Sequence, residues 1–177
     1  MKSFQNSSAV ESYSSRLELV RKYSWAVPNK EAIEEIVKYS PIVEAGAGTG
    51  YWASLIKDAG GDIIALDKFP PGAGNNYYQH NSQYYPVVYG DAETIASYSE
   101  RTLMLCWCPY DTDMGHDHIA LYTGKTLILI GEGRGGCCGN DKMFDLIDVN
   151  FTFKKLIKIP QWAGIHDTLV IYTRNID

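Results

Sequence analysis

The chain has 177 residues, of which 45% are hydrophobic and 21% are charged, and its net charge at pH 7 is −5. This length is typical of one domain, and no apolar run approaches the roughly 20 residues that a helix needs to cross a bilayer. The acidic balance disfavours a broad nucleic-acid surface, because affinity for phosphate comes from Lys and Arg. We therefore expect a soluble protein that does not bind membranes, and the polar start of the chain, which lacks a signal-like apolar stretch, predicts a cytoplasmic location.

The first 28 residues predict a helix followed by an aromatic segment. Leu17 and Val20 lie on one side of a helix expected over residues 8–23. Trp25 and Pro28 then interrupt the helical pattern. We expect residues 1–28 to form a helix and lid segment beside a domain that is made by residues 29–177.

Short apolar strands alternate with helices along the rest of the chain. The last two strands are expected to form an antiparallel hairpin, and residues 69–85 an irregular loop. Alternating strands and helices predict an α/β three-layer sandwich with a mostly parallel sheet covered on both faces. The expected strands are 42–45, 63–66, 86–89, 102–107, 126–130, 151–159 and 168–173, and the expected helical segments are 29–39, 51–58, 92–98, 119–122 and 141–148.

A glycine-rich turn joins the first strand to the next helix. Residues 44–50 read Glu-Ala-Gly-Ala-Gly-Thr-Gly, and glycine allows both a tight bend and the close approach of a ligand. A dinucleotide-binding pattern would place its third glycine or alanine at position 51, where this chain has Tyr51. The carboxylate of Glu44 also suits the ammonium group of a methionine better than a pyrophosphate. The turn thus favours S-adenosylmethionine, with a nucleotide-dependent oxidoreductase as an alternative.

Two further carboxylates follow the next two strands. Asp67 ends the second strand, where a carboxylate can accept hydrogen bonds from both hydroxyls of a ribose. Asp91 follows the third strand, where it can accept a hydrogen bond from the exocyclic amine of adenine. The carboxyl ends of parallel strands line one crevice, so we expect these groups to converge. The alternative is that either aspartate only caps a helix.

The order of residues 44–50, Asp67, Gly90-Asp91-Ala92 and the terminal hairpin resembles class I (Rossmann-like) S-adenosylmethionine-dependent methyltransferases, over residues 39–174. Three further stretches resemble a small, little-characterised subgroup: residues 107–110, 131–137 and 159–167. The resemblance implies a seven-stranded sheet whose last strand is antiparallel, and methyl transfer to a small-molecule or protein acceptor. The cofactor-binding residues that it implies are Glu44, Gly46, Ala47, Gly48, Gly50, Asp67, Asp91, Ala92 and Trp107.

The fourth strand leads into Cys106-Trp107-Cys108-Pro109-Tyr110. Enzymes that methylate the amine of adenine carry an Asn or Asp, two prolines and an aromatic here, and only Pro109 and Tyr110 match. The missing polar side chain disfavours methylation of adenine in nucleic acid. The altered motif also suggests one alternative to methyl transfer, a noncatalytic binding module with this fold. An RNA methyltransferase is kept as a second alternative.

Candidates for catalysis and for substrate binding lie in the loops. Histidine titrates near neutral pH and an arginine can clamp a carboxylate or phosphate, although each of these residues could equally belong to a solvated surface or a turn. The four cysteines form two tight pairs, 106/108 and 137/138, for which free thiols are expected and a zinc site is the alternative, so no metal is predicted. The predicted catalytic residues are Tyr110, His116 and His166, and the predicted substrate residues are Trp25, Tyr110, Arg134 and Trp162.

Overall fold

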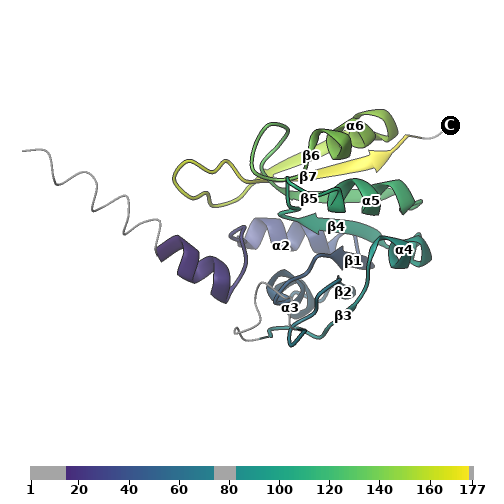
Figure 1. Ribbon diagram of the computed structural model, residues 1–177. Helices are drawn as coiled ribbons and strands as arrows, with labels where there is room; N and C mark the ends of the chain where they lie inside the picture. Colours follow the sequence, from purple (N-terminus) through teal and green to yellow (C-terminus); the bar gives the residue numbers. More distant parts are fainter. Residues whose placement is uncertain (1–14, 74–82, 176–177) are drawn as a thin grey trace, which may run out of the picture.

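The computed structural model describes residues 15–73 and 83–175, and these form a seven-stranded sheet between two layers of helices (Figure 1). The sheet order is β3-β2-β1-β4-β5-β7-β6. Residues 8–14 of the first expected helix and 74–82 of the expected loop lie outside the described residues. The strands are β1 Ile42–Ala45, β2 Ile63–Asp67, β3 Val87–Tyr89, β4 Thr102–Cys106, β5 Thr126–Gly131, β6 Phe151–Lys158 and β7 Thr168–Arg174.

The strand directions confirm the predicted mostly parallel sheet. β1 pairs in parallel with β2 and β4, β2 with β3, and β4 with β5. β7 is antiparallel to both of its neighbours, β5 and β6. β1 has its expected bounds, and each of the other strands differs by one residue at one end. β4 stops at Cys106 rather than at residue 107. Trp107 has a φ of 55°, a left-handed conformation that cannot continue a strand.

The two faces of the sheet are both buried, as the apolar strands require. Alternate residues of a strand point to opposite faces, so Met104 packs with α2 (Lys30–Val37) and α3 (Tyr51–Asp58), whereas Leu103 packs with the helices of the other layer. That layer consists of α4 (Ala92–Ile95), α5 (Met114–Leu121) and α6 (Asp141–Asn150), and a short 3₁₀ helix (Ala96–Tyr98) follows α4. The three-layer prediction is confirmed.

Helix α5 begins earlier than the sequence pattern predicts. The pattern indicated residues 119–122 as part of a helix that starts near residues 116–118, because Gly115 weakens the helical signal before them. In the structure Gly115 is buried, and a side chain at this position would collide with Met143 of α6. Packing against α6 therefore requires a glycine here, and the tertiary contact stabilises a helix that local propensity does not favour.

The described part of the N-terminal segment packs against the domain. Residues 15–22 are helical, and the side chains of Val20 and Ala26 are fully buried. The Thr49 hydroxyl donates a hydrogen bond to the carbonyl of Tyr23 (2.6 Å), which ties this segment to the glycine turn. The division at residue 28 remains a prediction. Among the residues that the structure describes, no helix is long and apolar enough to cross a membrane.

Candidate functional site

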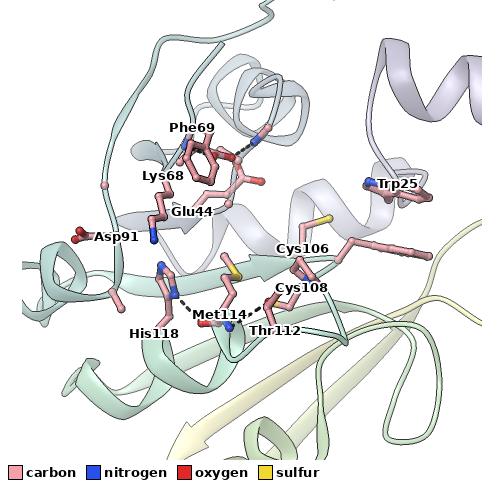
Figure 2. Close-up of a pocket in the computed structure, with 18 of the residues that line it drawn as sticks. Trp25, Glu44, Lys68, Phe69, Asp91, Cys106, Cys108, Thr112, Met114 and His118 are labelled. Atoms are coloured by element: carbon pink, nitrogen blue, oxygen red, sulfur yellow. Dashed lines mark hydrogen bonds between the residues drawn. The ribbon is translucent and has the colours of Figure 1, made fainter. Parts of the chain in front are cut away.

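A cavity of about 630 Å³ lies at the carboxyl ends of β1, β2, β3 and β4 (Figure 2). Its size is that of a pocket for a small molecule or cofactor. The structure brings together residues that are far apart in sequence, although their binding roles remain predictions. The predicted site residues that line the cavity are Trp25, Glu44, Gly46, Ala47, Gly48, Asp67, Asp91, Ala92 and Trp107.

The glycine turn bends the chain across the end of the cavity. Gly46 and Gly50 both have a φ of 73°, in the left-handed region that favours glycine. A Cβ at Gly46 would lie 2.7 Å from the terminal methyl of Met114, and one at Gly50 would lie 2.9 Å from the Cβ of Tyr85. The backbone conformation therefore favours glycine at both positions, and at Gly50 the close packing of Tyr85 also requires it.

Asp67 is connected to this turn by hydrogen bonds. Its Oδ2 accepts a hydrogen bond from the backbone N–H of Gly48 (2.9 Å), and its Oδ1 accepts one from Phe69 (2.8 Å). Burial raises the pKa of the Asp67 carboxyl, and these two N–H donors partly offset that effect. Each oxygen keeps a second lone pair, so the carboxylate can still accept hydrogen bonds from a ligand.

Glu44 lines the cavity wall and is buried with one oxygen unsatisfied. The residue is 2% exposed, and its Oε2 has no hydrogen-bond partner. Burial, with a smaller contribution from the charge of Asp67, raises the pKa of Glu44 to about 8. A buried acceptor without a donor is costly, so this group favours a ligand that supplies a cation or an N–H donor.

Asp91 caps α4, as the alternative reading of this residue predicted, and it also lines the cavity. Its Oδ1 accepts hydrogen bonds from the backbone N–H and the hydroxyl of Thr94, and its Oδ2 accepts one from the hydroxyl of Tyr89. The hydrogen bonds from Thr94, followed by the one from Tyr89, lower the pKa of Asp91 to about 2. Three of the roughly four acceptor positions of this carboxylate are thus already used.

Two tryptophans from distant segments line the cavity and stack on each other. The rings of Trp25 and Trp107 lie 4.8 Å apart at an interplanar angle of 13°, and the Arg16 guanidinium lies 5.5 and 5.6 Å from their centroids. The Trp107 indole donates to Asp167 (2.9 Å), which is fully buried. Burial raises the pKa of Asp167 to about 6. Trp107 is therefore held in its strained conformation by the stacking and by this hydrogen bond.

The structure adds His118 to the site, whereas the sequence had indicated His116. His118 is 7% exposed and lines the cavity beside Met114, one helical turn earlier on α5. His116 does not line the cavity and instead pairs with Asp117 (Nδ1 to Oδ1, 2.9 Å). The signal that could have found His118 is its spacing of four residues from Met114, which places both on one helix face.

The remaining predicted residues lie outside the cavity, and their roles remain predictions. Tyr110 is 62% exposed, and the His166 side chain is 79% exposed. Arg134 forms ion pairs with Asp145 (2.9 Å) and Asp148 (2.8 Å) of α6, which occupy its donors. Trp162, Gly50 and His116 complete this group.

The cysteines are free thiols. Cys106 and Cys108 line the cavity, and burial raises the pKa of the Cys108 thiol to about 12 and that of Cys106 well above its ordinary value. Across residues 15–73 and 83–175, no three His, Cys, Asp or Glu side chains are grouped so that they could hold a metal ion.

Comparison with known proteins relates this chain to others by structure alone. No family model matches the sequence, and no curated protein matches it. Magnesium protoporphyrin IX methyltransferase (ChlM) from Synechocystis PCC 6803, solved with bound SAH, superposes with a TM-score of 0.52 at 13% identity, over 91% of this chain and 94% of that one. The methyltransferase domain of bacterial CtHen1-C gives a TM-score of 0.55 at 10% identity, over 82% and 96%. The chain therefore has the fold of class I methyltransferases.

Proposed function

We propose that this chain binds S-adenosylmethionine in the cavity and transfers its methyl group to a small-molecule or protein acceptor. The observation that carries the proposal is the unsatisfied carboxyl oxygen of Glu44, which is buried at a glycine turn on the cavity wall. The ammonium group of the cofactor would supply the missing donor. The structural neighbour ChlM, solved with bound SAH, supports the same cofactor for this fold.

The other cavity residues fit the remaining parts of the cofactor. Gly46, Ala47 and Gly48 leave the backbone accessible beside its methionine part, and Asp67 retains lone pairs for the ribose hydroxyls. Asp91 and Ala92 lie at the end that would hold adenine. The cavity thus offers a complementary group for each part of one extended ligand.

When bound, the sulfonium of S-adenosylmethionine supplies an already activated methyl group, so the chain must chiefly place the acceptor and exclude water. Trp25 and Trp107 are suited to this, because they line the cavity with apolar surface and stack on each other. Figure 2 shows Trp25 on the side away from Asp91. The predicted catalytic residues Tyr110, His116 and His166 do not line the cavity. We therefore propose that placement rather than proton transfer is the main contribution of the chain.

The charge of the cavity lining disfavours an RNA or DNA acceptor. Six carboxyl side chains and one lysine, Lys68, line it, and a phosphate backbone would be repelled there. The carboxyl side chains are Glu44, Asp67, Asp91, Glu93, Asp113 and Asp117. A small molecule or an exposed protein side chain remains the favoured acceptor.

Calorimetric titration with S-adenosylmethionine and S-adenosylhomocysteine tests cofactor binding. We expect binding by the full chain, a large loss in Glu44→Gln, and no loss in Glu31→Gln, an exposed glutamate on α2. Absence of binding at high micromolar concentration would refute the proposal. Incubation with a methyl-labelled donor and cell extract then separates an enzyme, which yields a labelled product, from a noncatalytic module that only binds.

A further inference from the structure

The hydrogen bonds of His118 leave one ring nitrogen as an acceptor in the cavity. Its Nδ1 lies 2.7 Å from the backbone carbonyl of Met114, and a carbonyl oxygen can only accept, so Nδ1 carries the proton. Burial lowers the pKa of His118, which favours the neutral ring. In the neutral tautomer that this hydrogen bond selects, Nε2 has a lone pair and no proton.

This nitrogen lies at the end of the cavity where Asp91 caps α4. Figure 2 shows the His118 ring rising from α5 on the side where Lys68 and Asp91 lie. The charges of Asp91 and Asp67 are close enough to act on the pKa of His118. The His118 ring therefore faces the part of the cavity that would hold the adenine of the proposed cofactor.

The carboxylates on this side are less suited to recognise an exocyclic amine. Three donors from Thr94 and Tyr89 already occupy Asp91. Glu93 and Asp117 are exposed, so water competes for their oxygens. The His118 ring is buried and locked in one tautomer, and a buried acceptor discriminates strongly because an unmatched partner leaves it unsatisfied.

We propose that His118 Nε2 accepts a hydrogen bond from the 6-amino group of the cofactor's purine and so makes the site specific for adenine. This inference rests on the proposed function. A purine with a carbonyl oxygen at position 6 places that oxygen, which can only accept a hydrogen bond, opposite His118 Nε2, which is also an acceptor. His118 can relieve this only by giving up its hydrogen bond to Met114 or by taking up a proton, which its burial disfavours, so the pocket selects against that purine.

The test compares S-adenosylhomocysteine with S-inosylhomocysteine, in which oxygen replaces the 6-amino group. We expect the unaltered chain to bind the adenosyl ligand about 10- to 100-fold more tightly, the range for losing one hydrogen bond to a buried group. In His118→Leu the ratio of affinities should approach one. In His118→Gln the adenosyl ligand should still bind and the ratio should also approach one, because a carboxamide can present either an oxygen or an N–H.

The ratio separates recognition from a structural role, since a variant that merely distorts the cavity weakens both ligands together. The thermal unfolding midpoint without ligand reports whether each variant is folded, and His118→Gln decides if His118→Leu does not fold. An unchanged ratio in the variants, or no preference in the unaltered chain, would overturn the inference while cofactor binding stands. If the unaltered chain binds neither ligand, the proposed function fails and this inference fails with it.

Discussion

Replacing Glu44 by glutamine perturbs the folding free energy in a pH-dependent way. The pKa of this carboxyl is about 8 in the folded chain and 4.5 ordinarily. Between these values the folded chain keeps a proton that the unfolded chain has released, so stability falls as the pH rises through this window. At 1.36 kcal/mol for each pH unit above 4.5, the cost at pH 7 is about 3 kcal/mol. Glutamine cannot ionise and avoids this cost.

We therefore expect Glu44→Gln to be more stable than the unaltered chain at pH 7 by up to about 3 kcal/mol, or roughly 10 °C in the unfolding midpoint. At pH 5 the difference should shrink to about 1 kcal/mol or less. Thermal and urea unfolding at both pH values, without ligand, measure this difference. Glu31→Gln is the exposed control and should shift neither midpoint.

The outcome that would refute this reasoning is a stability difference between Glu44→Gln and the unaltered chain that is the same at pH 5 and pH 7. That result would mean that Glu44 is ionised in the folded chain at neutral pH. The expected result, together with loss of cofactor affinity in the same variant, would show that the chain gives up stability to keep a buried acceptor for its ligand.

Three further predictions follow from the site. S-adenosylmethionine should bind more tightly as the pH rises from 6 to 8, because its ammonium favours ionised Glu44 and binding releases the proton of that carboxyl. Calorimetry in buffers of different ionisation enthalpy should detect the release of this proton. Proton uptake on binding would contradict the prediction. Gly50→Ala should lose about 1–3 kcal/mol more stability than Gly72→Ala. Both glycines have a positive φ, but only a Cβ at Gly50 would meet neighbouring atoms. Equal losses of stability in urea unfolding would argue against this prediction. Trp107→Phe should cost roughly 1–3 kcal/mol, because the buried Asp167 loses its indole donor, and unchanged urea unfolding would show that this hydrogen bond contributes nothing.

The fold could be predicted largely from local patterns. Strands buried on both faces are mostly apolar, such as Thr126–Gly131 and Ile42–Ala45, in which Glu44 is the exception. The glycine turn and Asp67 lie directly after such strands, and parallel strands bring their carboxyl ends to one edge. These residues were therefore predicted together and are found together along the cavity.

Residues on helices and long loops could not be placed in the same way. His116 and His118 differ by two positions, which turns them to different sides of α5, and the sequence pattern did not predict that α5 begins at Met114. Arg134 was predicted to bind a substrate, with a solvated surface position as the alternative, and its ion pairs with Asp145 and Asp148 of α6 could not be predicted. The burial of Asp167 against Trp107 depends on two segments 60 residues apart.

The sequence by itself thus determined the strands, the glycine turn and the carboxylates that follow the strands, because strand patterns and turn chemistry are local properties. The tertiary structure alone decided which histidine faces the cavity, that Trp25 stacks on Trp107, and that Glu44 keeps an unsatisfied oxygen. Each of these depends on how separate elements pack and exclude water, and such packing is a property of the assembled layers rather than of any one segment.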